Sequence, residues 1–583
     1  MTHLFLAMTS AATALSFFAV PNPKLSPSGS GASSAMMSIM KYAGPTQKRN
    51  RFGFVHVSCN AGMRENKGFV KGKILNSFFN LNRRRSTPVS SLLSRHLSTN
   101  SLNNSSSQRQ PPSTRYLIHW RGEHKEQYSE VFRQWEFLSA VSATIADASG
   151  ICDASIVLKS LKERAIFTNA FSYKRNDQLA APASLSQDEM YNQALQYVHF
   201  TNDGTDSHLI CNEIMPQITP KNIERATKRC SLIHASFIVL ADAPSYQELG
   251  KKSLLSRSFE GMIQESGTES SWRFRRHELS FVDDDENTRF GKSSTRSVQK
   301  ERAALQQLKS LLTKIQGRVD LENADIEIYL YEGLHDKQRA TESLDATTRH
   351  SLFKILGRKL ASGSTHSIMA PKTRITHTNT PLESIAAYLL CNIALIKDNQ
   401  TILDPFAGSA ATLLASGLII PSVRTVGIDT ATNESTSRDD IREDFKVRGV
   451  AEPAALLEGS ILQETTRDKA RECIGDTAFD VVVTDPPYGI RESMSDTGVE
   501  NDDSAALSDL IDVIGRDRKC GKPLLKPDGG KLVAFLPCPR GVDIHDVLPS
   551  RQRLVSAGLH LQQKSEQKLN DSLSRWIISF TSI

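Results

Sequence analysis

From about residue 379 to the C-terminus, short apolar runs alternate with stretches whose apolar residues recur at helical spacing. The first helical stretch has its apolar residues at Leu382, Ile385, Leu389, Ile393 and Ile396, and the apolar run Thr401–Leu403 follows it. An alternation of short buried strands with helices predicts a parallel sheet that helices cover. We therefore predict that residues 381–583 form a separate α/β domain.

A polar loop of distinctive composition follows the apolar run Phe479–Val483. It reads Thr484-Asp485-Pro486-Pro487-Tyr488-Gly489. Because ligands of open α/β sheets bind beyond the carboxyl ends of the strands, this loop lies where chemistry is expected. The alternative is a tight Pro-Pro turn that only ends a core strand. The strand before the loop and a second motif upstream favour the functional interpretation.

The residues of this loop suit the methylation of an exocyclic amine on a nucleobase. Such an amine is a poor nucleophile because its lone pair is delocalised into the ring, so acceptors must hold its N–H groups while the lone pair faces the methyl donor. Asp485 can accept one N–H through its carboxylate, and Pro486 can offer a carbonyl that the restricted Pro486-Pro487 backbone holds in place. Tyr488 offers a flat face on which an extruded base can stack. We predict these four residues, Asp485, Pro486, Pro487 and Tyr488, as the catalytic set.

A second loop, within Leu403–Thr412, also joins an apolar strand to the start of a helix. Its small residues let the backbone approach a nucleoside closely, and N–H groups at the helix start can bind a carboxylate. The expected ligand is S-adenosyl-L-methionine, with its amino group near Asp404. Asp429, at the end of the next strand, can accept both ribose hydroxyls, as acidic residues do in dinucleotide-binding folds. The residues predicted from these two loops to bind the cofactor are Asp404, Pro405, Phe406, Ala407, Gly408 and Asp429.

Along the chain, the turn Asp404–Gly408 comes first, Asp429 follows, and the loop Thr484–Gly489 comes last. Motifs in this order resemble those of class I S-adenosylmethionine-dependent methyltransferases, and residues 114–583 resemble the THUMP-domain tRNA (guanine-10-N2) methyltransferases. The segments that carry the resemblance are Gly317–Asp325 with its following strand, Leu356–Ala361, Asp404–Gly408, Thr484–Arg491, Gly529–Pro537 and Leu573–Ile578. The resemblance implies an α/β fold with a Rossmann-like catalytic domain, preceded by an α+β ferredoxin-like and THUMP module that docks tRNA. It further implies methylation of N2 of a guanosine in tRNA, at position 10, together with a small zinc-binding activator subunit.

Two positions depart from the family pattern. Ser409-Ala410 stands where the family usually has Thr-Gly, and Ala410 would be strained by about 1 kcal/mol if this backbone needs a positive φ. The family often places an acidic residue near the adenine, whereas this chain has Ser460, which we predict as the replacement in cofactor binding. These departures motivate a competing hypothesis, an RNA-binding factor without catalysis. Among enzymes, the alternatives are methylation of another RNA guanine or of adenine in DNA, because the same loop orients either amine.

The resemblance and the composition together divide the chain. We predict a disordered leader or presequence over residues 1–113, a ferredoxin-like plus THUMP-like RNA-binding region over 114–345 with an insertion at 175–219, and a linker over 346–380. In the RNA-binding region, the patterns predict strands at Tyr116–Trp120, Ala154–Leu158, Ile166–Phe171 and Ile326–Tyr331, and helices at Trp135–Ala148 and Ser297–Gln316.

Charge is unevenly distributed along the chain. Residues 1–115 hold 15 Lys and Arg and a single acidic residue, Glu65, while the whole chain has 71 basic and 64 acidic residues, so the body after the leader is acidic. The stretch Trp272–Arg318 runs against this trend with 11 basic and 6 acidic residues. It predicts either an anion-binding surface or a solvated helix face.

The acidic-poor leader, rich in Ser and Asn, is typical of an organellar transit segment, but a disordered arm or a gene-model extension accounts for it as well. We expect a cytoplasmic protein, because the resemblance places the tRNA substrates and the activator there, with the mitochondrion or plastid as the alternative. The 8 cysteines form no CxxC pair and no His lies at metal-ligand spacing, so we predict no metal site. The apolar start of the chain is interrupted and too short to predict a membrane span.

Overall fold

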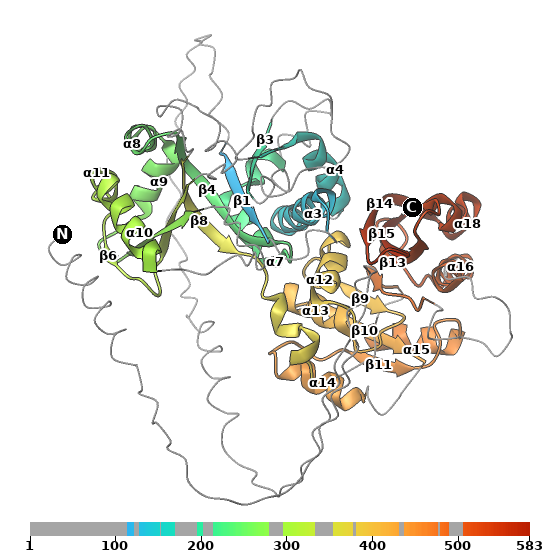
Figure 1. Cartoon of the computed structure of the whole chain (residues 1–583). Helices are drawn as coiled ribbons and strands as arrows, with labels where there is room; N and C mark the ends of the chain where they lie inside the picture. The colour runs from blue at the N-terminus through green and yellow to red at the C-terminus, as the bar shows by residue number, and fades with distance from the viewer. Residues whose placement is uncertain are drawn as a thin grey trace, which may run out of the picture. The chain divides into compact units, whose positions relative to one another are not determined.

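The computed structural model contains two β-sheets with their helices (Figure 1). All residues that it describes lie within the unit Pro111–Ile583. The described residues are 114–121, 128–151, 153–169, 195–201, 214–278, 295–332, 354–376, 381–430, 437–475, 478–488 and 505–583. The predicted leader 1–113 lies outside them.

The C-terminal sheet has seven strands in the order β11-β10-β9-β12-β13-β15-β14. Neighbours from β11 to β13 are parallel, whereas β15 runs antiparallel to both β13 and β14. The strands are β9 (Thr401–Asp404), β10 (Arg424–Asp429), β11 (Ala455–Glu458), β12 (Val481–Thr484), β13 (Lys531–Pro539), β14 (Leu559–Lys568) and β15 (Leu573–Ser582). The predicted parallel sheet is confirmed, and the alternation of apolar runs did not predict its antiparallel end.

Helices cover the seven-stranded sheet because its strands are apolar on both faces. In β12, the side chains of Val481 and Val483 join one buried cluster and that of Val482 joins another, as the pleat of a strand requires. The helices are α12 (Ser384–Ile393), α13 (Ala411–Ile419), α14 (Arg438–Lys446), α15 (Glu464–Ile474), α16 (Ala505–Lys519), α17 (Ile544–Val547) and α18 (Arg551–Ala557).

The N-terminal sheet has eight strands in the order β2-β3-β1-β4-β8-β7-β5-β6. Its strands are β1 (Tyr116–Trp120), β2 (Ala165–Asn169), β3 (Leu195–Phe200), β4 (Ile233–Ala243), β5 (Ser271–Glu278), β6 (Arg318–Val319), β7 (Ile326–Glu332) and β8 (Lys354–Ser362). Its helices are α3 (Glu130–Ser149), α4 (Ala154–Arg164), α7 (Pro220–Arg229), α8 (Tyr246–Leu254), α9 (Arg257–Glu265), α10 (Thr295–Gln307) and α11 (Lys309–Leu312). The predicted elements at β1, β2, α3 and β7 are confirmed. The predicted helix Ser297–Gln316 is confirmed in part, because it is divided into α10 and α11 and ends at Leu312.

Three expectations for this region are wrong. Ala154–Leu158 is the start of α4, because Asp153 caps the helix by accepting the N–H of Ser155 and Val157 is buried one turn before Leu161. Within the predicted insertion 175–219, residues 195–200 form β3, which pairs with both β1 and β2. The residues of 175–194 lie outside the described part of the chain.

The third wrong expectation is the linker at residues 346–380. Lys354–Ser362 is instead β8, which pairs with β4 and β7 in the interior of the sheet. Leu356 packs with the cluster beneath α8 to α11, while its neighbour Ile355 joins a cluster that includes Leu117 of β1. The described connection to the seven-stranded sheet is therefore shorter, and it contains two 3₁₀ turns, η4 (His366–Met369) and η5 (Pro371–Thr373).

A buried polar network joins α3 to α12. The carboxylate of Glu136 accepts the backbone N–H groups of Ser231 (2.6 Å) and Leu232 (2.9 Å) and the side-chain amide of Asn392 (3.0 Å). Burial raises the pKa of Glu136, and these donors oppose the rise. Phe132 of α3 belongs to the same apolar cluster as α12. The helix that precedes β9 is thus fixed by both apolar and polar contacts.

None of the helices in the described ranges is long and apolar enough to cross a membrane. In the same part of the chain, no group of three or more His, Cys, Asp or Glu side chains could hold a metal ion.

Candidate active site

Three polar loops meet at one edge of the seven-stranded sheet. The parallel neighbours β10, β9 and β12 end at Asp429, Asp404 and Thr484. The chain leaves β9 toward β10 on one side and returns to β12 on the other, so β9 and β12 flank the point where the strand order reverses. Ligands of open α/β sheets bind at such a point.

Asp404 connects two of these loops. Its buried carboxylate accepts the hydroxyl of Thr484 at 2.7 Å, the hydroxyl of Thr412 and the backbone N–H of Phe406 at 3.1 Å. Burial raises the pKa of Asp404 to about 6, the three donors oppose the rise, and the charge of Asp485 adds to it. Asp404 therefore ties the start of α13 to the end of β12.

The turn after β9 lies directly against the end of β10. The N–H of Gly408 donates to the carboxylate of Asp429 at 2.6 Å, and the N–H of Ala407 donates to the carbonyl of Ile428 at 2.9 Å. Gly408 has φ +48°, and a Cβ added there would have no atom of the chain within 4 Å. The backbone at Gly408 is therefore open to a ligand.

Ala410 adopts the left-handed conformation that the sequence analysis considered. It has φ 57° and ψ 35°, lies immediately before α13, and its methyl group is buried in the core. A non-glycine residue here carries a backbone cost of about 1 kcal/mol. The departure from the family pattern is therefore a site of strain in the turn that is predicted to bind the cofactor.

We expect Ala410→Val to lower the free energy of unfolding by about 2–4 kcal/mol, because a β-branched side chain adds to the strain and overfills the core. Ala410→Gly removes strain of about 1 kcal/mol but also a buried methyl group worth about 0.8 kcal/mol, so its net effect stays within about 1 kcal/mol. Urea denaturation of both variants measures the difference. Equal destabilisation by Val and Gly would contradict the strained turn.

Ser460 lies at the same edge, just beyond β11. Gly459 donates its N–H to the carbonyl of Asp429 at 3.0 Å, which brings Ser460 next to the end of β10. The Ser460 hydroxyl accepts the N–H of Leu462 at 3.2 Å. Glu458, the acidic residue before them, pairs with Arg438 at 3.0 Å on the surface.

The loop after β12 forms a small hydrogen-bonded unit. Tyr488 donates its hydroxyl to Oδ1 of Asp485 at 2.5 Å. Burial raises the pKa of the Tyr488 phenol, and the charge of Asp485 adds to the rise. Pro486 is buried, while Asp485, Pro487 and Tyr488 are partly exposed. Gly489–Arg491, which completes the motif, lies outside the described residues.

Sequence reasoning missed three side chains near this loop. Arg575 of β15 lies within electrostatic range of Tyr488 and Asp485. Glu383, directly before α12, lies 3.8 Å from Arg575 and accepts the hydroxyl of Tyr128 at 3.0 Å. Arg575 belongs to a segment that resembles the family, but that segment carries no signal for a role.

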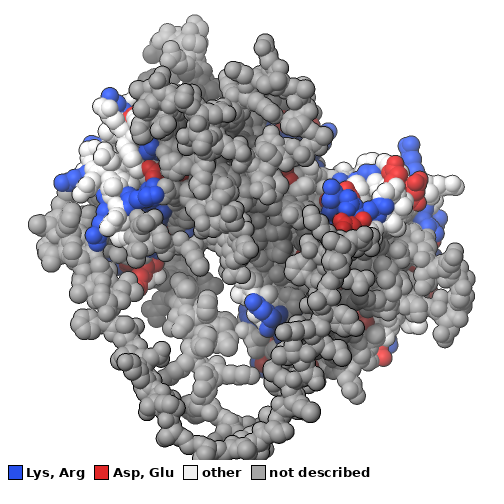
Figure 2. All heavy atoms as spheres, viewed as in Figure 1, with Lys and Arg blue, Asp and Glu red and all other residues white. Residues whose placement is uncertain are grey.

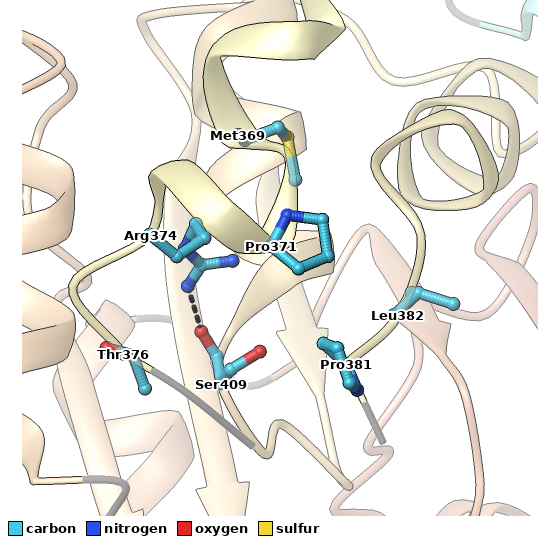
Figure 3. Close-up of a pocket in the computed structure, with 7 residues that line it drawn as sticks. All are labelled: Met369, Pro371, Arg374, Thr376, Pro381, Leu382 and Ser409. Carbon is cyan, nitrogen blue, oxygen red and sulfur yellow. Dashed lines mark hydrogen bonds between the residues drawn. The ribbon is translucent and has the colours of Figure 1, made fainter. Parts of the chain in front are cut away.

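Arg374, in the segment that connects β8 to α12, contacts the turn after β9. Its guanidinium donates to the carbonyl of Ser409 and to the carboxylate of Asp444, the latter at 2.7 Å. Figure 3 shows Arg374 beside Ser409 in a small pocket that Thr376 also lines. The buried hydroxyl of Thr376 has no hydrogen-bond partner among the described residues. No sequence pattern pointed to Arg374, since its partners lie far along the chain.

Comparison with known proteins shows similarity to methyltransferases. The family model of the RMKL-like methyltransferase domain matches residues 371–501, which include all the predicted site residues. The chain is 28% identical over 290 residues to the tRNA (guanine(10)-N(2))-methyltransferase of Xenopus laevis, covering 46% of this chain. It is 35% identical over 109 residues to the tRNA (guanine(10)-N2)-dimethyltransferase of Methanothermobacter thermautotrophicus, covering 18% of this chain and 27% of that protein.

The match to the frog protein spans 58% of that protein's length. Among solved structures, TrmN from Thermus thermophilus is similar at 15% identity with a TM-score of 0.31, over 66% of this chain and 89% of that one.

Proposed function

We propose that this chain, which carries an RMKL-like methyltransferase domain and is similar to tRNA (guanine(10)-N(2))-methyltransferases, methylates the exocyclic N2 of a guanosine in tRNA, at position 10. One observation carries the proposal. The Asp404 carboxylate joins the start of α13 to Thr484, the residue before Asp485, at the point where the strand order reverses. The predicted cofactor turn and the predicted amine-orienting loop thus form one site.

The donor and acceptor groups at this edge fit S-adenosylmethionine. Gly408 leaves its backbone open, the Asp429 carboxylate lies against it, and α13 begins within the same turn. We propose that the turn from Asp404 to Gly408 holds the amino acid part of the cofactor and that Asp429 accepts its ribose hydroxyls, with Ser460 near the adenine. The cofactor supplies an electrophilic methyl group on a sulfonium.

The chain's own part in the reaction is to orient the amine. The Asp485 carboxylate accepts one N2–H and the Pro486 carbonyl accepts the other, so the nitrogen lone pair is directed at the methyl group. The hydroxyl of Tyr488 fixes the Asp485 carboxylate, which retains acceptor capacity because a carboxylate has about four lone-pair sites. The ring of Tyr488 forms a wall against which the base can stack.

Phosphate contacts supply most of the affinity of a nucleic-acid-binding protein, so a basic surface is needed on an otherwise acidic body. Figure 2 shows Lys and Arg side chains gathered over the region of α8 to α11. Lys309, Lys314 and Arg318, within the basic stretch of the sequence, are exposed. We propose that the N-terminal region is the THUMP-type module that docks tRNA through this surface.

The proposal extends to a partner and a compartment. By resemblance, we propose that the protein acts with a small zinc-binding activator subunit. We also propose the cytoplasm as its location, with a mitochondrion or plastid as the alternative. Both statements rest on the resemblance.

The test of the proposal is transfer of labelled methyl groups from S-adenosylmethionine to unmodified tRNA, with and without the activator subunit. We expect label in tRNA and none in single-stranded or duplex DNA. Label in DNA alone would favour the adenine alternative. RNA binding without cofactor binding or transfer would favour the RNA-binding factor.

The raised pKa of Asp404, about 6, predicts a pH dependence of cofactor binding. The cofactor is cationic at its sulfonium and ammonium groups, so it binds better when Asp404 is ionised. Affinity should be close to its maximum above about pH 7 and fall about tenfold between pH 7 and pH 5, as Asp404 takes up a proton. Isothermal titration calorimetry across this range measures it. Asp404→Asn should bind more weakly at pH 7 and lose the pH dependence, and an unchanged profile in that variant would contradict this role.

A further inference from the structure

Arg575 is held rigidly at the edge of the sheet that carries the catalytic loop. Its Nε donates to the side-chain carbonyl of Gln567 at 2.5 Å, and Gln567 lies directly opposite on β14. Its guanidinium carbon lies 4.1 Å from the ring centroid of Phe535. The residue is only 6% exposed. A guanidinium fixed by a hydrogen bond on one edge and an aromatic ring on one face has little freedom to turn.

Register places this guanidinium beside the predicted catalytic loop. In the parallel pair, Thr484 of β12 lies opposite Ala534 of β13, and Arg575 lies opposite Pro537, three residues further along β13. Burial lowers the pKa of Arg575, but attraction to Tyr488, Asp485, Tyr128 and Glu383 outweighs it and raises the pKa overall. Arg575 is therefore a charged donor among acceptors at the carboxyl edge.

One terminal nitrogen of Arg575 makes an ion pair but no hydrogen bond. Nη2 lies 3.8 Å from the Glu383 carboxylate and has no hydrogen-bond partner within the described part of the chain. Buried donors in folded proteins are almost always paired, and a buried unpaired charged donor is costly. A fixed guanidinium nitrogen that has an anion nearby but no hydrogen-bond acceptor, next to the predicted catalytic loop, indicates that a ligand supplies that acceptor.

We propose that Arg575 donates a hydrogen bond to O6 of the target guanine and so determines the choice of base. The inference rests on the proposed function, in which Asp485 accepts an N2–H of the same base. Guanine presents an acceptor at O6 and donors at N1 and N2 on one edge, and the site presents a guanidinium beside two carboxylates, Asp485 and Glu383. Adenine carries an amino group where guanine has O6, so it would face Arg575 donor to donor.

The test compares two tRNA substrates that differ at the target nucleotide, guanosine or 2-aminopurine riboside. Both have an amino group at C2, but 2-aminopurine lacks O6 and the N1–H, so the O6 contact is measured by the part of the guanosine preference that depends on Arg575. The unaltered protein should prefer guanosine by about 10-fold to 100-fold in kcat/KM, the size of a specific base contact. In Arg575→Met, kcat/KM for guanosine should fall by about that factor, while kcat/KM for 2-aminopurine should change by less than about threefold. The variant should therefore lose most of the preference for guanosine. A residue that only supports the structure would lower both rates equally.

The matched control is Arg553→Met, which removes an exposed arginine that pairs with Asp512 in the same domain. It should keep the full preference for guanosine. If Arg575→Met fails to fold by circular dichroism, Arg575→Lys carries the test, because a shorter donor should reduce the preference at least threefold. An unchanged guanosine preference in a folded Arg575 variant would overturn the inference while leaving the proposed function intact. Absence of transfer to guanosine by the unaltered protein would overturn both.

Discussion

Asp485→Ala is expected to reduce methyl transfer to tRNA by about 10²-fold to 10³-fold, the size seen when one preorganised group that stabilises a transition state is removed. The acceptor is needed most as positive charge develops on the amine, so its loss affects the chemical step more than ground-state binding. Binding of S-adenosylmethionine and of tRNA should change by less than about threefold. Single-turnover kinetics and separate binding titrations measure these quantities.

The matched control for Asp485 is Asp512→Ala. Asp512 is a partly exposed carboxylate of the same domain whose partner is the surface residue Arg553, at 2.9 Å. It should leave transfer within about twofold of the unaltered protein. Turnover of the Asp485→Ala variant close to that of the unaltered protein would remove Asp485 from the catalytic set.

Asp444→Ala is expected to lower the free energy of unfolding by about 3–5 kcal/mol, because it leaves two buried guanidinium groups without their carboxylate. Asp444 accepts Nε of Arg374 (2.7 Å), Nη1 of Arg448 (2.8 Å) and the backbone N–H of Ile375 (2.7 Å), and its side chain has no exposure. Since Arg374 also donates to the Ser409 carbonyl, the variant should also weaken cofactor binding.

The stability that the Asp444 network contributes also depends on pH. Burial acts to raise the pKa of Asp444, but the Ile375 N–H and the Arg374 guanidinium outweigh it and hold the pKa below its usual range. The folded-state pKa is lower than the unfolded one, so this contribution to stability is present above a pH of about 4 and is lost as the pH falls below it.

Chemical denaturation at pH 7 tests the Asp444 prediction directly. The control is Asp439→Ala on the same helix. The side chain of Asp439 is 94% exposed and forms an ion pair with Arg442 at 3.2 Å. It should change the free energy of unfolding by about 0.5 kcal/mol or less. A loss of under 1 kcal/mol in Asp444→Ala would show that the buried network contributes little.

The catalytic sheet was predictable because its strands are continuous apolar runs and its loops follow them directly. Val481–Val483 are buried on both faces, and a buried strand of this kind is recognisable without tertiary information. The position of Asp404, Asp429 and Asp485 at one edge then follows from parallel topology alone. A positive φ at Ala410 was considered because the family usually has glycine there, and the structure shows it.

Features that depend on distant pairing were not predictable. The strand β3 lies between β1 and β2 in the sheet, and both partners are far from it in the sequence. Residues 195–200 therefore showed no local signal beyond a short apolar run. The segment Leu356–Ala361 was interpreted as a linker because its Gly and basic residues interrupt the alternation of apolar and polar residues that would have predicted the strand β8. Residues such as Arg374 and Arg575 act through partners from other elements, and only the fold brings these together.

Nucleoside mass spectrometry of tRNA after reaction with the protein, its activator and S-adenosylmethionine tests the central claim most directly. The account predicts N2-methylguanosine at position 10 with the unaltered protein and none above background with Asp485→Ala. A methylated adenosine, or N2-methylguanosine formed equally well by both proteins, would contradict it.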